Sequence, residues 1–84
     1  SKRAKDIMET LTDKEKEVVN FIIKSKGETT QAKVYHETGI AKSSLHRQVK
    51  SLENKKVIDV MKVGKVKKIK FTDWFLGKEK TKKK

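Results

Sequence analysis

One stretch of the chain, residues 42–50, concentrates side chains that donate hydrogen bonds to anions. Its donors are Lys42, Ser43, Ser44, His46, Arg47 and Lys50. Lysine and arginine neutralise phosphate groups, and a guanidinium can also donate two parallel hydrogen bonds to guanine in the DNA major groove. The chemistry expected of this stretch is therefore recognition of a polyanion through both phosphates and base edges.

The spacing of apolar residues predicts that this stretch belongs to a helix over residues 42–55 with two contrasting faces. The aliphatic arc holds Leu45, Val49 and Leu52. The opposite arc is polar and basic, with Ser43, Arg47, Lys50 and Asn54 at its centre and Ser44, His46 and Ser51 at its flanks. Such a division is what a helix needs if one side joins a core and the other meets nucleic acid.

We expect different roles along the polar face. Free N–H groups and the positive end of the helix dipole favour a phosphate beside residues 42–44. Arg47 is expected to read a base, whereas Lys50 and Ser43 could reach either a base or a phosphate. His46 is expected to contact a phosphate when protonated.

The residues before this helix predict a shorter helix and a tight turn. Thr30 is the expected N-cap of a helix over residues 31–38, and Gly39 suits the left-handed conformation that ends it. Ala32, Val34 and Tyr35 are available to the core, and Ile40 should fill the space between the two helices. A short helix, a turn and a longer basic helix form the helix-turn-helix order, whose second helix lies in the major groove.

Residues 58–71 predict a β-hairpin that turns at Gly64-Lys65, a pair suited to a type II′ turn. This register pairs Ile58 with Phe71 and Val63 with Val66, and it gathers apolar residues on one side of the hairpin root. Lysines surround the tip: Lys62, Lys65, Lys67 and Lys68. We expect residues 62–68 to form a wing that contacts the DNA backbone, supplying affinity rather than sequence choice.

The two ends of the chain predict further helices. Residues 1–11 show helical spacing of apolar residues, and this extension could cover the core, pair with a second subunit or continue from an upstream domain. Thr12 and Glu15 have capping-box spacing and should begin a helix that Gly27 ends. Residues 28–30 could add a brief third strand.

Thr72 and Asp73 are expected to cap a short last helix through residue 76. Its three large apolar residues, Trp74 to Leu76, should pack on the core, with a dimer contact as the alternative. We expect a winged domain over residues 12–76 and a disordered basic tail over residues 77–84, whose lysines would add nonspecific attraction to DNA. The expected fold class is α+β and mainly helical, with a three-helix core and a hairpin wing.

Charge is unevenly distributed along the chain. The net charge is +12, and residues 1–28 carry seven basic and six acidic side chains, whereas residues 29–84 carry sixteen and five. The positive field therefore falls on the expected helix-turn-helix, hairpin and tail, as a polyanion-binding surface requires. A lysine-rich surface that serves only solubility is the alternative.

The stretch TTQAKVYHETGIAKSSLHRQVKSLENKKVI resembles the winged helix-turn-helix of MarR-like transcription regulators, including small archaeal ones. The matching residues are Thr30-Gln31-Ala32, Thr38-Gly39-Ile40, Lys42-Ser43-Ser44-Leu45, Arg47, Leu52-Glu53 and Val57-Ile58. The resemblance covers about residues 12–71 and implies duplex-DNA binding through the third helix and the wing, often as a dimer.

The sequence departs from that family's pattern at three positions. Ala41 replaces the usual capping serine, so the side-chain cap of the recognition helix should be lost or replaced by water. Lys56 replaces a usual glycine, so the helix exit should differ. Tyr35 replaces a usual alanine, which implies a rearranged contact or an exposed ring.

Composition and motifs argue against several other classes. The chain has no cysteine, and His36 and His46 fall in different predicted helices without acidic partners at ligand spacing, so no metal site is expected. No glycine-rich phosphate loop or catalytic set stands out, and no segment suits a membrane span. We expect no enzyme activity, no cofactor, no small-molecule ligand and a cytoplasmic, nucleoid-associated location.

Three functions remain open from the sequence. The first is duplex-DNA binding in transcription regulation, with helix 42–55 in the major groove and a homodimer through the terminal helices. The second is a protein-interaction module in a replication, transcription or membrane-remodelling assembly, which would use the apolar faces of residues 4–23 and 74–76. The third is a nonspecific chromatin-type binder with equal affinity for every duplex.

Overall fold

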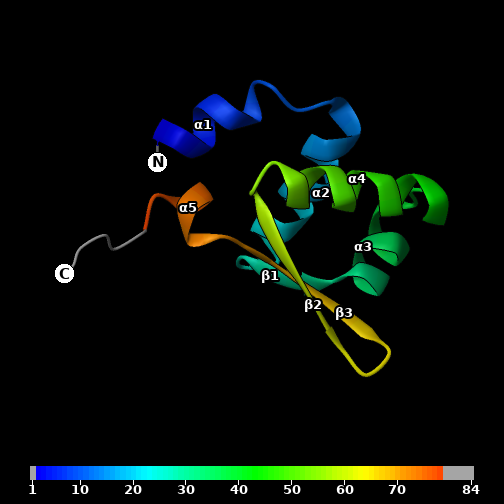
Figure 1. Cartoon of the computed structure of the whole chain (residues 1–84). Coiled ribbons are helices and arrows are strands. Elements are labelled where there is room, and N and C mark those ends of the chain that lie inside the picture. The colour runs from blue at the N-terminus through cyan, green and yellow to red at the C-terminus, as the bar shows by residue number, and fades with distance from the viewer. Residues whose placement is uncertain (1, 79–84) are drawn as a thin grey trace.

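A computed structural model describes residues 2–78. In chain order its elements are α1 (Lys2–Met8), α2 (Asp13–Lys24), β1 (Glu28–Thr30), α3 (Gln31–Thr38), α4 (Lys42–Asn54), β2 (Ile58–Val63), β3 (Val66–Phe71) and α5 (Asp73–Leu76). This range therefore forms an α+β fold with five helices and a three-stranded antiparallel sheet (Figure 1). The architecture is compatible with a winged-helix-like fold.

Threonine hydroxyls begin three of the helices, as the sequence predicts. Thr12 and Glu15 form a complete capping box at α2, in which each side chain accepts a hydrogen bond from the other residue's backbone N–H. Thr30 caps α3 by accepting from the Lys33 N–H, and Thr72 caps α5 by accepting from the Phe75 N–H. At α4, Ala41 provides no side-chain cap.

A lysine in the left-handed conformation follows the end of two helices. Lys26 follows α2 with a φ of 65°, and Lys56 follows α4 with a φ of 63°. In both places the next residue's N–H reaches back five residues along the chain, from Gly27 to Ile22 and from Val57 to Leu52. The expectation that Gly27 ends the helix is therefore wrong: α2 ends at Lys24, and Lys26 takes the strained position that glycine usually fills.

The sheet has the strand order β1-β3-β2. The β2–β3 pairing has the predicted register, from Ile58 opposite Phe71 to Val63 opposite Val66. Gly64 carries a φ of 62°, which fits the first central position of a type II′ turn. Figure 1 shows this hairpin extending away from the helices.

The core lies between α2, α3, α4 and the inner face of the sheet. Its buried side chains are Leu11, Val18, Val19, Ile22, Val34, Ile40, Leu45, Val49, Leu52, Val57, Ile58, Ile69, Phe71 and Phe75. Ile40 fills the turn between α3 and α4 as predicted. Ala32 does not join the core, because the first turn of α3 presents it to solvent while Val34 and the half-buried Tyr35 face inward.

The two terminal helices pack against each other. Arg3 of α1 donates a hydrogen bond to the Trp74 carbonyl over 2.8 Å, and its guanidinium lies 5.0 Å from the centre of the Trp74 ring. Phe75 of α5 is 3% exposed, which confirms the core placement predicted for it. The predicted tail does not begin at residue 77, because Gly77 ends α5 and the Lys78 N–H bonds to the Asp73 carbonyl; residues 79–84 lie outside the described residues.

Candidate nucleic-acid interface

α4 presents the two faces that its sequence predicts. Leu45, Val49 and Leu52 are buried, between 0% and 4% exposed. Most of the predicted contact residues on the helix are exposed: Lys42, Ser43, His46, Arg47 and Lys50. Ser44 is half-buried. The donors that could meet nucleic acid are therefore accessible, and the aliphatic stripe holds the helix to the core.

A buried carboxylate fixes the other end of α4. Glu15 of α2 is 1% exposed, and it accepts hydrogen bonds from Ser51 Oγ (2.6 Å) and from Lys55 Nζ (3.0 and 3.1 Å). Ser51, which the helical projection placed beside the polar face, thus turns toward α2. Burying a charge is tolerated only where partners compensate it, and here they tie two helices together.

The environment of Glu15 also shifts its ionisation. Burial raises the pKa of the Glu15 carboxyl. Hydrogen bonds from Ser51, the Thr12 N–H and Lys55, together with the charge of Lys55, lower it by more. The pKa therefore lies below its ordinary value of 4.5, and Glu15 is ionised near neutral pH.

An aromatic contact supports the first turn of α4, which lacks a side-chain cap. Lys42 Nζ lies 5.1 Å from the centre of the Tyr35 ring, and the His36 ring meets the same tyrosine edge-on with centroids 5.4 Å apart. Of the two outcomes expected for Tyr35, the rearranged contact is the observed one. The cation–π contact positions Lys42 over α3.

A hollow runs between α4 and the hairpin, and we call it the helix–hairpin groove. It is lined by Gln31 of α3, by His46, Val49, Lys50 and Glu53 of α4, by Val60 and Lys62 of β2 and by Lys67 of β3. The structure thus brings together four predicted contact residues that lie up to 21 positions apart in sequence. Lys62 and Lys67 are directly opposite each other across the two strands.

A second hollow continues toward the tip of the hairpin. It brings Lys42 of α4 beside Lys65 and Lys67, with Tyr35, His36 and again Gln31 in its lining. The predicted donors at the start of α4 and those at the hairpin tip therefore share one continuous surface, with Gln31 and Lys67 lining both hollows.

The predicted set does not lie on a single surface. Lys68 lines a different hollow, on the outer face of the sheet, together with Met61, Lys70 and the acidic residues Glu28 and Asp59. Strand alternation explains this, because Lys68 and Lys67 are adjacent in sequence and point to opposite faces. Arg47 and Ser43 line neither hollow on the α4 side, and they project from the exposed part of that helix.

Sequence reasoning did not identify two residues of the groove. Gln31 and Glu53 are named in the sequence analysis only among the residues of the MarR-like resemblance, with no contact role. Nothing in the local pattern marks Gln31, because only the fold places the start of α3 between α4 and the hairpin. For Glu53 a signal was present: it lies three residues after Lys50, on the same side of a predicted helix.

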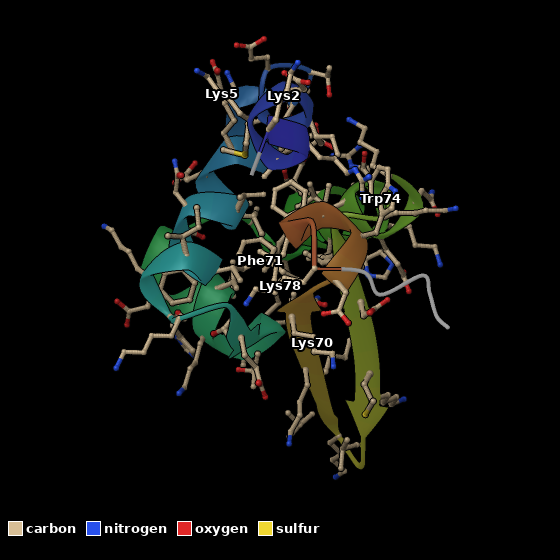
Figure 2. The ribbon with its side chains drawn as sticks, turned by 90° about the vertical axis from the view of Figure 1, so that its left-hand side faces the viewer. Lys2, Lys5, Lys70, Phe71, Trp74 and Lys78 are labelled. Carbon is tan, nitrogen blue, oxygen red and sulfur yellow. The ribbon has the colours of Figure 1, made fainter. Side chains whose placement is uncertain are left out.

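Other lysines lie on the side of the molecule that carries α1 and α5. Figure 2 shows Lys2 and Lys5 projecting from α1, and Lys70 and Lys78 below Trp74. Lys70 lies between Glu28 and Asp59 across the three strands, so neighbouring carboxylates offset its charge. None of these four lysines lines the helix–hairpin groove.

The fold and this surface define a small α+β domain with a cationic groove between a helix and a hairpin. The chain belongs to the DUF7343 family, a domain of unknown function, whose model matches residues 10–72. The match extends from the end of α1 to the end of β3 and includes the whole groove, whereas α1 and α5 lie outside it. No curated protein and no solved structure matches the chain. Among the described residues, every helix is too short or too polar to span a bilayer.

Proposed function

We propose that this chain is a winged helix-turn-helix that binds double-stranded DNA. In this proposal α3 and α4 form the helix-turn-helix, α4 enters the major groove, and the β2–β3 hairpin is the wing. The observation that carries the proposal is the helix–hairpin groove, where His46 and Lys50 face Lys62 and Lys67 across a hollow. Four donors that converge on one channel suit a phosphodiester strand passing between helix and wing.

The MarR-like resemblance supports a role in transcription regulation at the cytoplasmic nucleoid. Arg47 projects from α4 outside the groove, where it can reach a base edge while the groove holds the backbone. Lys42 and Lys65 extend the phosphate-binding surface toward the tip. Lys68 faces away and would contribute only to the general positive field. A homodimer through α1 and α5 remains a prediction.

Two alanine variants test this division of labour. Arg47→Ala should flatten the preference among sequences and cost about 1–3 kcal/mol on the preferred duplex. Lys67→Ala should weaken all duplexes alike and reduce the salt slope by about one. Both would be measured by duplex titration and by selection from a random-sequence pool.

Lys24→Ala is the matched control, because it removes the same charge from the exposed end of α2, away from the groove. It should change affinity less than Lys67→Ala does. An equal loss on every sequence in both the Arg47 and Lys67 variants would refute the assignment of base reading to Arg47.

A protein-interaction module remains a second candidate. Three exposed apolar side chains of the hairpin favour it: Met61 (59% exposed), Val63 (48%) and Val66 (45%). The apolar faces of residues 4–23 and 74–76 that the sequence suggests for this role contribute largely to the core, since Val18, Val19, Ile22 and Phe75 are buried. Absence of duplex binding at low salt, together with capture of a protein partner that Met61→Ser abolishes, would favour this candidate.

A further inference from the structure

One side chain of the helix–hairpin groove has the wrong charge for a phosphate. Glu53 of α4 lines the same hollow as His46, Lys50, Lys62 and Lys67. It is half-buried, and within residues 2–78 it forms no ion pair with any of these lysines. Glu53 therefore adds a carboxylate to the lining of the channel, and within the described residues no ion pair neutralises it.

The helix dipole does not explain a carboxylate at this position. Glu53 lies in the last turn of α4, where free carbonyl groups make the helix end partly negative, and that turn contains no basic residue. A glutamate there is unfavourable for the helix itself. The place of Glu53 in the lining of the groove is therefore what suggests a role for it.

Within the groove the carboxylate acts on two things. It offsets repulsion between Lys62 and Lys67, which are directly opposite each other and carry like charges. It also repels any phosphate that enters the hollow. Two unit charges about 4 Å apart interact by about 1 kcal/mol in water and more strongly where water is partly excluded, so the effect on binding is measurable.

We propose that Glu53 is a specificity-determining residue that penalises nonspecific duplex binding. The inference rests on the proposed function. A duplex read by Arg47 is held in one register, with its phosphates at the lysines. A duplex whose bases Arg47 does not recognise binds in many registers, and the registers that bring a phosphate close to Glu53 are disfavoured. The repulsion therefore weakens binding to duplexes that Arg47 does not recognise more than binding to duplexes that it does recognise.

Glu53→Gln tests the proposal, with Glu37→Gln as its control. Both glutamates lie in the last turn of a helix, and both changes raise the net charge by one. Glu37 is exposed and lines a hollow between α2 and α3, on the far side of α3 from the groove. The control therefore reproduces the change in charge and in helix dipole without altering the groove.

The probes are a random-sequence pool of duplexes of about 20 base pairs and the duplexes that the wild-type protein selects from it. Glu53→Gln should bind the unselected pool about tenfold more tightly and lower the ratio of selected to unselected affinity severalfold. Glu37→Gln should change either affinity about twofold or less.

Three results would overturn the inference: equal effects of the two variants, a weaker affinity of Glu53→Gln for the pool, or an equal gain on selected and unselected duplexes. A wild-type protein that binds no duplex at low salt would instead remove the proposed function on which the inference rests. Thermal unfolding of both variants shows whether the fold is intact, and a Glu53→Gln protein that loses stability together with affinity also contradicts the proposal.

Discussion

Two neighbouring threonines at the end of β1 use their hydroxyl groups differently. Thr30 caps α3 by accepting a hydrogen bond from the Lys33 N–H over 3.2 Å. Thr29 is 6% exposed, and its Oγ1 has no hydrogen-bond partner in the described part of the chain. A buried hydroxyl without a hydrogen-bond partner destabilises the folded state, whereas a hydroxyl that caps a helix stabilises it.

Thr29→Val should therefore stabilise the protein. Valine keeps the shape and the β-branch of threonine and removes the unpaired hydroxyl, so we expect a gain of about 1 kcal/mol and a Tm higher by about 4–8 °C. Thr30→Val should lose about 1 kcal/mol because it removes the cap. Thermal and urea unfolding measure both, and a Thr29→Val protein less stable than wild type would contradict this account of the hydroxyl.

At the residue scale, the sequence predicts what depends on near neighbours. The caps at Thr12, Thr30 and Thr72 depend on residues three positions away, and all three are confirmed. The partners of Glu15 could not be predicted in this way. Ser51 and Lys55 lie 36 and 40 positions further along the chain, and only packing of α2 on α4 brings them to the carboxylate.

At the element scale, the Glu15 contacts hold α4 against α2. The helix has no side-chain cap at its start, and a lysine in a left-handed conformation follows its end. The start therefore lacks a side-chain cap, and the exit places a lysine where glycine is usually found. The hydrogen bonds from Ser51 and Lys55 to Glu15 attach the C-terminal part of α4 to α2.

Glu15→Gln should destabilise the protein near pH 7 by about 1–3 kcal/mol, because hydrogen bonds to a charged group are replaced by weaker ones. The folded-state pKa of Glu15 is below its ordinary value of 4.5, so ionised Glu15 stabilises the fold above that value. This contribution disappears as the pH falls through the lowered pKa. The difference between wild type and variant should therefore shrink in acid.

Urea unfolding across an acidic pH series measures this effect. Glu17→Gln is the control, because Glu17 is an exposed carboxylate of the same helix. We expect the control to show a smaller change in the free energy of unfolding. A Glu15→Gln protein whose deficit stays constant or grows in acid would contradict the role assigned to the ionised carboxylate.

Element boundaries were predictable where caps, glycines and strand alternation agree. The hairpin register is one example, since a slip by one residue would move Ile58 and Ile69 out of the core. The exit of α2 was not predictable from glycine alone, because Lys26 adopts the left-handed angle one residue earlier. The grouping of lysines by sequence likewise assigns Lys68 to the same contact surface as Lys67. Strand alternation instead turns Lys68 to the opposite face of the sheet.

At the scale of the whole molecule, the fold brings part of the net charge of +12 together on one surface. Lys42, His46, Lys50, Lys62, Lys65 and Lys67 come from three elements and the hairpin turn, and they line the two adjoining hollows beside α4. The lysines of α1 and β3 on the other side are separate from them or offset by acids. The sequence predicted the positive half of the chain, but only the fold shows that these residues share one surface.

The most direct test of the central claim is the salt dependence of duplex binding by the intact chain. If α4 and the hairpin hold about six phosphates, the affinity for a duplex of about 20 base pairs should fall roughly a thousandfold between about 50 and 200 mM salt. Fluorescence anisotropy across that range measures it. No binding at the lower salt concentration, or an affinity that salt leaves unchanged, would contradict the account.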